Sequence, residues 1–376
     1  MSLYTQHAQQ RARVVALYSH REREPRHEQA THFEIARRLA HIQGLQFVGE
    51  YDLARPAPGG VYLVPTATIV GLDLARELNI TDERDLFGGV VAEPFVATKA
   101  VTHPLVAPNA QAPAGWSTAF CQRVRDAVLP GVSAFSATDA QQAGLRLLQD
   151  GPVRIKPVLA TAGRGQRVVH DAAEMRSVLS GLDKADMSVN GLVLERNLVN
   201  VVTHSVGQVR VAGIIATYYG TQQLTTDHSG ETVYGGSTLT VARGGFCELL
   251  ALDLPESARR AAEQARIYDA AASDCFVGFL ASRRNYDIAE GTDAHGKHHC
   301  GVLEQSWRIG GASSAEVLAL EAFSQEPSLR YVHSRSVEFY DEDREPPANA
   351  VVLYRGHDDD VGFITKYAYI ERHGNS

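Results

Sequence analysis

Apolar positions recur in two different patterns along the first hundred residues. Short apolar runs, which indicate buried β-strands, occur at residues 14–19, 46–48 and 60–65. Between the first two runs, apolar residues spaced three and four apart predict an amphipathic helix over residues 32–45. A second helix is predicted over 69–78, and a further strand-like run lies at 89–92. Because strands and helices alternate, residues 1–106 are expected to form a small α/β domain with a parallel sheet.

The chain then changes in composition. Residues 107–115 are rich in Pro, Ala, Asn and Gly, which is typical of a linker. Helices are predicted over 117–128 and 137–151, and a third helix is expected to begin at Asp171, a residue suited to an N-cap. These elements define a second unit, which we place at residues 107–190.

Strand patterns dominate the rest of the chain. A third unit, residues 191–325, contains strand-like runs at 192–195, 199–202, 208–219 and 238–241. An Ala-rich helix is predicted over 258–272, and the Gly-rich, polar interval 225–237 is expected to be an exposed, mobile loop. Residues 326–376 alternate as three more strands and are expected to form a β-rich extension. The chain as a whole is therefore expected to be an α/β (α+β) protein.

The central stretch, VRIKPVLATAGRGQRVV, joins a strand to a glycine-rich loop and a second strand. Lys156 ends the first strand, and Gly163 and Gly165 lie in the loop. Glycine loops bring backbone N–H groups close to an anion, and a lysine beside them adds a positive charge suited to a phosphate. The loop lacks the GK[ST] ending of a P-loop and the third glycine of a dinucleotide fingerprint. An ordinary hairpin with a Gly-rich turn is the alternative.

A second candidate for chemistry is a predicted β-hairpin, RRNYDI and GVLEQS around the turn-rich EGTDAHGKHH. A turn near His295-Gly296 places Asp287 opposite Glu304. Ser306 shares a face with Glu304, because alternate residues of a strand point the same way. Two carboxylates and a hydroxyl suit Mg²⁺, or Mn²⁺ in its place. A solvated pair of polar residues is the alternative, but Arg308 and a glycine pair follow at once, as in an anion site beside a metal site.

Charge and cysteine content narrow the class of protein. The formal net charge is −8, which argues against a general nucleic-acid-binding role. The 4 cysteines are widely spaced and form no CxxC pair, so a disulfide framework is not expected. The N-terminus lacks the apolar core of a signal peptide, and no apolar run reaches the length of a membrane span. We expect a cytoplasmic protein with no membrane partner.

In order along the chain, these motifs resemble those of the ATP-grasp superfamily: KPVLATAGRGQ, then VLE, then RRNYDI with LEQSWRIGG. More narrowly, they resemble an uncharacterised bacterial family often labelled biotin carboxylase-like. The resemblance covers about residues 85–320. It implies an ATP-grasp fold in which a pre-ATP-grasp domain precedes two lobes that clasp ATP.

The resemblance also implies roles for individual residues. Lys156 would hold the α- and β-phosphates, and Arg308 would steady the transferred phosphoryl group. Asp287 and Glu304 would bind Mg²⁺, with Ser306 standing where the family usually has Asn. The other expected nucleotide-binding residues are Gly163, Arg164, Gly165, Gln166, Glu195 and Leu198. Lys99 is the candidate for an earlier phosphate lysine, although its sequence context fits poorly.

One further residue and the substrate region complete the expectations. Arg243 is either a contact for phosphate or substrate or a surface charge at a strand end. Residues 221–245 are expected to determine the substrate.

The expected activity is an ATP- and Mg²⁺-dependent ligase that converts a carboxylate into an acyl phosphate for attack by an amine or similar nucleophile. Alternatives are an ATP-binding module without turnover and a biotin carboxylase-like enzyme. The latter is disfavoured because only about fifty residues follow Leu320. The partners are expected to be small molecules, and a homodimer is left open. Each of these possible activities requires the glycine loop and the acidic hairpin, which carries Asp287 and Glu304, to face each other across one cleft.

Overall fold

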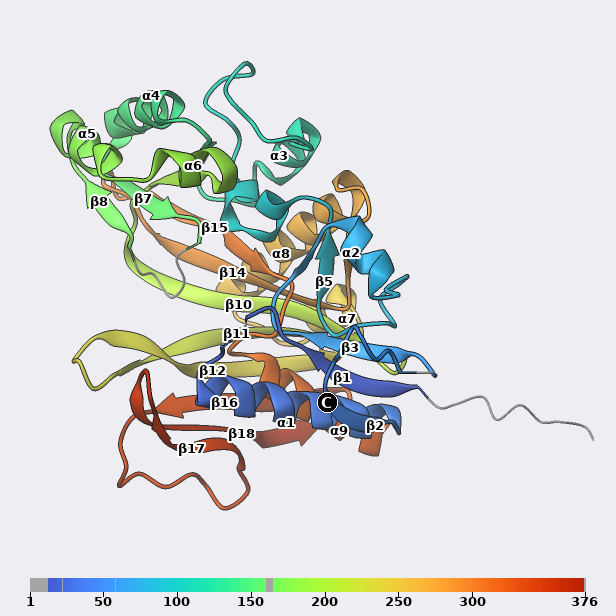
Figure 1. The fold of residues 1–376 in the computed structure, drawn as a ribbon. Helices are drawn as coiled ribbons and strands as arrows, with labels where there is room; N and C mark the ends of the chain where they lie inside the picture. Colours follow the sequence, from blue (N-terminus) through green and yellow to red (C-terminus); the bar gives the residue numbers. More distant parts are fainter. Residues whose placement is uncertain (1–12, 22, 58, 160–164, 375–376) are drawn as a thin grey trace, which may run out of the picture.

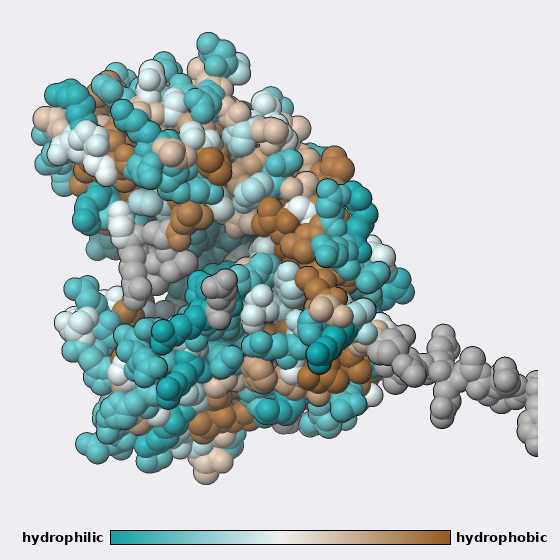
Figure 2. Space-filling view, viewed as in Figure 1, coloured by the Kyte–Doolittle hydropathy of each residue, from teal (hydrophilic) through white to brown (hydrophobic). Residues whose placement is uncertain are grey.

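The computed structural model describes residues 13–21, 23–57, 59–159 and 165–374. These residues form four β-sheets with helices against them (Figure 1). One sheet is much larger than the others and runs through the middle of the molecule. In Figure 1 a smaller lobe (green) lies above the long strands of this sheet, and the C-terminal strands (red) lie below them. This arrangement leaves a hollow between the two halves, visible in Figure 2.

The N-terminal segment forms a three-stranded parallel sheet in the order β2-β1-β3. Its elements are β1 (Val14–Tyr18), α1 (Arg26–Gln43), β2 (Gln46–Glu50) and β3 (Val61–Pro65). This confirms the predicted α/β arrangement. Helix α1 begins six residues earlier than predicted, directly after Pro25, and ends at Gly44, whose φ of 64° is the left-handed conformation that glycine adopts readily.

A second small sheet, in the order β13-β5-β4, joins this segment to residues 280–281, just before β14 (Arg283–Thr292). Its strands and the helices around them are β4 (Ile69–Val70), α2 (Leu72–Glu77), β5 (Gly89–Val91), η1 (Pro94–Ala97), η2 (Lys99–Thr102) and β13 (Leu280–Ala281). The helix predicted over 69–78 is wrong in its first residues. Ile69 and Val70 pair with β5 instead, and Gly71, with φ at 99°, separates the strand from the helix.

The smaller lobe contains a four-stranded antiparallel sheet in the order β6-β9-β7-β8. The elements of this region are α3 (Thr118–Val124), β6 (Gly131–Ala134), α4 (Ala137–Leu147), η3 (Leu148–Asp150), β7 (Val153–Pro157), β8 (Arg167–Val169), α5 (Ala172–Ser180), α6 (Lys184–Asn190) and β9 (Leu192–Arg196). Ala143, Met175 and Met187 of its helices pack on Ile155 and Leu194 of its strands. The pairing of β7 with β8 confirms the hairpin predicted around the glycine loop.

The largest sheet has eight strands in the order β15-β14-β10-β11-β12-β16-β18-β17. Its strands are β10 (Val199–Val211), β11 (Ile214–Thr226), β12 (Thr232–Arg243), β14 (Arg283–Thr292), β15 (His298–Ser306), β16 (Tyr331–Phe339), β17 (Val351–Asp358) and β18 (Gly362–Gly374). The predicted run 208–219 is two strands, because Ala212 and Gly213 turn the chain with φ values of 50° and 78°. Most of the loop predicted over 225–237 is instead the paired end of β11 and β12.

Three more helices, α7 (Phe246–Leu250), α8 (Glu256–Cys275) and α9 (Ser313–Gln325), complete the fold. Alanines of α8 pack against Tyr286 and Val302 of the large sheet, while α9 and α1 pack on Tyr218 and Val241. The β-rich extension predicted for the C-terminus is confirmed, and its strands continue the large sheet by pairing β16 with β12. Among the described residues, no helix combines the length and the apolar content needed to span a membrane.

Candidate active site

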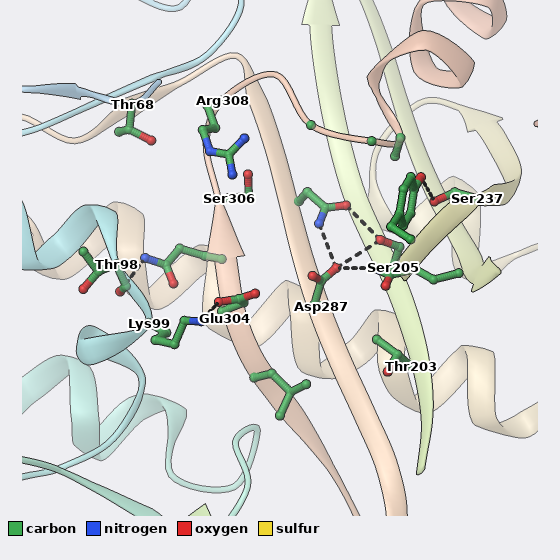
Figure 3. Close-up of a pocket in the computed structure, with 18 of the residues that line it drawn as sticks. Thr68, Thr98, Lys99, Thr203, Ser205, Ser237, Asp287, Glu304, Ser306 and Arg308 are labelled. Carbon is green, nitrogen blue, oxygen red and sulfur yellow. Dashed lines mark hydrogen bonds and ion pairs between the residues drawn. The ribbon is translucent and has the colours of Figure 1, made fainter. Parts of the chain in front are cut away.

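A cavity of about 540 Å³ opens between the smaller lobe and one face of the large sheet. Its walls come from η2, from both ends of the glycine hairpin, from β10 to β12, and from the acidic hairpin β14–β15. Figure 3 shows Lys99 beside Glu304, and Asp287 beside Ser205. Val158, Leu159 and Gln166 flank the tip of the glycine hairpin and line the same cavity as Asp287 and Glu304. Therefore the described parts of the two predicted motifs do face each other across one cleft.

The acidic hairpin has the register that the sequence predicts. Asp287 on β14 lies directly opposite Glu304 on β15, and a bulge follows at Ile288. The turn is closed by Asp293, whose Oδ1 accepts hydrogen bonds from the backbone N–H groups of His295 (2.9 Å) and Lys297 (3.0 Å). Asp293 thus stabilises the turn, and the opposed pair Asp287–Glu304 is left to face the cavity.

Asp287 is held by three hydrogen-bond donors, all on the same carboxylate oxygen. Oδ1 accepts from Gln222 Nε2 at 3.0 Å, Asn285 Nδ2 at 3.1 Å and Ser205 Oγ at 3.2 Å (Figure 3). Burial and the neighbouring Glu304 carboxylate raise the pKa of Asp287 to about 6, despite these donors. Two carboxylates forced together in this way form a favourable site for a cation.

Lys99 supplies one cation to this pair. It begins η2 after Thr98, whose side chain caps that helix, and its Nζ lies 2.9 Å from Glu304 Oε2. The side chain is 9% exposed and lines the cavity. The sequence alone leaves the role of Lys99 open, because its context is unlike the expected motif. The structure places it beside the acidic hairpin, from an element almost two hundred residues away in the chain.

Ser306 and Arg308 lie at the other end of the same wall. Ser306 Oγ and the Arg308 guanidinium both line the cavity, and Arg308 Nη1 donates to the carbonyl of Ile309 at 2.7 Å. Burial and the nearby Arg283 cation lower the pKa of Arg308. Between β12 and the 310–312 loop, Tyr234 packs against Gly311, where a Cβ atom would lie 2.5 Å from its ring.

Lys156 and Glu195 contact each other rather than the cavity. Lys156 Nζ forms an ion pair with Glu195 Oε2, and His103 Nε2 lies 2.8 Å from Glu195 Oε1, all three side chains being buried. Burial alone would raise the pKa of Glu195, but Lys156 and His103 offset it and lower the pKa to about 2. Neither Lys156 nor Glu195 is among the described residues that line the cavity.

The remaining predicted nucleotide-binding residues are spread more widely. Gly163 and Arg164 lie outside the described residues. Gly165 has φ at 69° and is exposed, and Gln166 accepts a hydrogen bond from Arg154 on β7 at 3.1 Å. Leu198 packs with Leu129 and Ala289 in a small apolar cluster and is not among the described residues that line the cavity, although Leu303, which packs against this cluster, is.

Arg243 is also placed elsewhere. Its guanidinium donates to the carbonyl of Phe323 at 2.7 Å and lies over the ring of that residue, so the structure favours the alternative of a charge at a strand end.

Several residues that line the cavity were missed by the sequence interpretation. They include Gln222 and Leu224 of β11 and Tyr234 and Ser237 of β12, within the region 221–245 expected to determine the substrate. Alternation along the two strands was the available signal, but the Gly-rich composition of the interval favoured a loop. Arg283 was also missed, because a double arginine at a strand start gives no sign of burial.

The oxygen groups of the cavity can be compared with the ligands that Mg²⁺ prefers. The described residues contain no cluster of three His, Cys, Asp or Glu side chains able to enclose a metal ion. Asp287 and Glu304 offer two carboxylates, and Ser306 adds a hydroxyl. Among the described residues, none donates a hydrogen bond to Asp287 Oδ2. This oxygen-rich but incomplete set fits Mg²⁺ that also takes phosphate oxygens and water as ligands.

Comparison with known proteins places the chain in a family. A family described as "Protein of unknown function (DUF3182)" matches residues 14–368. The chain belongs to the DUF3182 family. No curated protein is similar enough in sequence to count as a match.

Solved structures resemble the DUF3182 protein over most of its length. The biotin carboxylase domain of 2-oxoglutarate carboxylase from Hydrogenobacter thermophilus, solved with MgADP, ADP and bicarbonate, is 13% identical with a TM-score of 0.50. The match covers 95% of this chain and 86% of that one. This likeness shows the fold, so the expected ATP-grasp fold is confirmed for the DUF3182 protein.

Two further structures are similar over comparable lengths. Biotin carboxylase from Campylobacter jejuni is 12% identical with a TM-score of 0.49, covering 94% of the DUF3182 protein and 87% of that chain. An L-amino acid ligase from Bacillus licheniformis is 14% identical with a TM-score of 0.47, covering 96% and 94%.

Proposed function

We propose that this protein is an ATP- and Mg²⁺-dependent ligase that phosphorylates a carboxylate and transfers the resulting acyl group to an amine or similar nucleophile. The observation that carries the proposal is the convergence of Asp287, Glu304, Lys99 and Arg308 on one cavity that the glycine hairpin also borders. The cavity volume of about 540 Å³ lies in the ordinary range for small-molecule sites. The ATP-grasp fold adds support, since the biotin carboxylase domain with that fold was solved with MgADP.

The chemistry follows from where the charges lie. A carboxylate is a poor electrophile, and transfer of the ATP γ-phosphoryl group to one of its oxygens gives an acyl phosphate with ADP as the leaving group. The nucleophile then attacks the acyl carbon, and phosphate departs. Positioning and neutralisation of charge supply most of the catalysis in such transfers. Mg²⁺, when bound, would neutralise phosphate oxygens beside Asp287, Glu304 and Ser306.

The protein's own residues divide this work. Lys99 contacts a phosphate oxygen, either after breaking its ion pair with Glu304 or while keeping it. Arg308 contacts the phosphoryl group that is being transferred. The backbone of the glycine hairpin covers the phosphates, with Gln166 at its base. Lys156 and Glu195 hold the strands β7 and β9 together where the nucleotide enters, and Lys156 reaches the phosphates once ATP displaces its pairing with Glu195. The second substrate lies against β11 and β12, near Gln222 and Ser237.

A second candidate function is an ATP-binding module that does not turn over. Ser306 favours it, because a serine oxygen reaches less far than an asparagine oxygen and leaves the set of metal ligands weaker. A carboxylating, biotin carboxylase-like reaction would use the same activation step with bicarbonate as the carboxylate.

The test is a screen for ADP release. Purified protein is incubated with ATP, Mg²⁺ and panels of carboxylates, bicarbonate included, with and without amines and thiols. The proposal expects ADP formation that requires both Mg²⁺ and one class of carboxylate, and that Glu304→Ala abolishes. Nucleotide binding without ADP release under every condition favours the module, and release with bicarbonate alone favours carboxylation.

A further inference from the structure

A fully buried ion pair lies in the wall of the cavity, which Arg283 lines. Arg283, at the start of β14, is 1% exposed, and Glu316, in the first turn of α9, is 0% exposed. The contact is bidentate: Arg283 Nη2 lies 2.7 Å from Glu316 Oε1, and Nε lies 3.1 Å from Oε2. A pair of this geometry has little freedom to rotate, so its remaining hydrogen bonds point in fixed directions.

One set of those hydrogen bonds ends on backbone carbonyl groups at and just beyond the C-terminal end of β15. Arg283 Nη1 donates to the carbonyl oxygen of Arg308 at 2.6 Å and to that of Ser306 at 3.1 Å. Ser306 is the last residue of β15, opposite Asn285, and Arg308 lies two residues beyond the strand. Arg283 therefore determines the path of the backbone that carries Ser306 and Arg308 into the cavity.

The other set ends on Asp287. The hydroxyl of Tyr218 donates to Glu316 Oε1 at 2.6 Å and also lies 2.7 Å from Asn285 Oδ1. Asn285 Nδ2 in turn donates to Asp287 Oδ1 at 3.1 Å. Tyr218 is fully buried, and Gly207 on the adjacent strand leaves room for its ring, since a Cβ there would lie 2.3 Å from the hydroxyl.

We infer that the Arg283–Glu316 pair is a positioning centre for the active site: through Tyr218 and Asn285 it turns Asp287 Oδ2 toward the cavity, and through backbone carbonyls it places Ser306 and Arg308. The inference rests on the proposed function, because it takes Asp287 as a ligand of Mg²⁺. Arg283 and Asn285 border the cavity, whereas Tyr218 and Glu316 do not, and the pair acts on the metal ligands through the hydrogen bonds described above.

The arrangement is more than a means of stabilising the fold. A buried ion pair is often no more stable than apolar residues of the same size, so its retention calls for another role. Here Arg283 donates to the backbone of Ser306 and Arg308, which line the cavity. Glu316 accepts a hydrogen bond from Tyr218, whose hydroxyl also contacts Asn285, another residue that lines the cavity. Hydrogen-bond partners behind a metal ligand orient it and strengthen binding of the metal.

Tyr218→Phe tests this inference, because it removes only the hydroxyl that links Glu316 to Asn285. Mn²⁺ binding is measured from the electron paramagnetic resonance signal of free Mn²⁺, in the presence of a non-hydrolysable ATP analogue. We expect Tyr218→Phe to weaken Mn²⁺ binding by about tenfold, while the affinity for the analogue without metal stays unchanged. Tyr286→Phe is the matched control. Tyr286 is fully buried next to Asp287 on β14, but its hydroxyl donates to Asp269 at 2.6 Å, on the other face.

The outcomes separate the inference from the function on which it rests. Equal Mn²⁺ affinity in the wild-type protein and in Tyr218→Phe overturns the inference, as does an equal loss in Tyr286→Phe. If the wild-type protein with the analogue binds no Mn²⁺, the proposed metal site itself is wrong and the inference fails with it. Should Tyr218→Phe not fold, Asn285→Ala, which removes the amide between Tyr218 and Asp287 Oδ1, must show the same selective loss of Mn²⁺ affinity.

Discussion

Lys99 Nζ lies 2.9 Å from Glu304 Oε2, although the two residues come from a short helix before the smaller lobe and from the far strand of the large sheet. The contact closes one side of the cavity and balances one of its two carboxylates. A lysine in this position is already desolvated, so an incoming phosphate competes with a carboxylate and not with water. This makes Lys99 the most direct point at which to test nucleotide binding.

Lys99→Met is expected to weaken ATP binding by about ten- to a hundredfold, the usual effect of losing one hydrogen bond to a charged group. Methionine keeps the length and the apolar stem of the side chain and removes its charge. Binding is measured by calorimetric titration with ATP and Mg²⁺. Lys184→Met, on the exposed face of α6, serves as the control and should bind ATP normally. Unchanged ATP affinity in Lys99→Met would show that Lys99 does not contact the phosphates.

Ser306→Asn is expected to strengthen the metal site. Ser306 stands on the cavity wall beside Glu304, and asparagine carries its oxygen about one bond further into the cavity, where an oxygen ligand suits Mg²⁺. The Mg²⁺ concentration needed for half-maximal nucleotide binding should fall several-fold, while Ser306→Ala should raise it. If both variants need the same Mg²⁺ concentration as the wild-type protein, Ser306 is not a ligand.

The motifs that the sequence predicts correctly are hairpins, in which the paired residues lie close together in the chain. The turn around His295-Gly296 is where the sequence predicts it, and Asp287 lies opposite Glu304 as predicted. The register next to the turn pairs Ile288 with Val302, and a bulge between Ile288 and Asp287 is what brings Asp287 opposite Glu304. The strand before the glycine loop and its return strand were also predicted from neighbouring residues. In both cases a turn sets most of the pairing on either side of it, but the bulge was not predicted.

Contacts between distant segments were not predictable in the same way. The nearness of Lys99 to Glu304 depends on how η2 packs against β15, and the pairing of Lys156 with Glu195 depends on the alignment of β7 with β9. The strands of the interval 225–237 are a different case, because Thr225 and Thr226 pair with Val233 and Thr232 in a local hairpin, and β16 joins only at Gly236 and Ser237. They were missed because the Gly-rich, polar composition favours a loop, although the pairing of β11 with β12 holds it as strand.

Gly311→Ala is expected to destabilise the protein and disturb the substrate side of the cavity. The new Cβ would lie 2.5 Å from the Tyr234 ring, so the ring must move away from its hydrogen bonds with Ser237 (2.7 Å) and Ser336 (3.2 Å). Overpacking of this kind costs about 1–3 kcal/mol, which thermal unfolding can measure.

Gly310→Ala is the matched control for that substitution, since its Cβ would meet Arg283 at an ordinary 3.6 Å. It should unfold close to the wild-type temperature. Equal unfolding temperatures for the two variants would mean that Tyr234 has room to move at little cost.

The buried ion pair of Lys156 with Glu195 predicts how stability depends on pH. The pKa of Glu195 is lowered from 4.5 to about 2 in the folded protein, so the unfolded chain binds more protons between these values. The stabilising contribution of the carboxylate is therefore complete above about pH 4.5 and is lost as pH falls toward 2. At about 1.4 kcal/mol per pKa unit, it amounts to at most about 3.5 kcal/mol.

Glu195→Gln should remove this contribution. Its free energy of unfolding in urea should be lower than that of the wild-type protein at pH 7, and the difference should shrink steadily between pH 4.5 and the lowest pH at which the protein folds. Glu263→Gln, at an exposed position on α8, should unfold like the wild-type protein at each pH. A difference between Glu195→Gln and wild type that stays constant down to the acid limit would show that the loss comes from packing at β9 and not from the charge of Glu195.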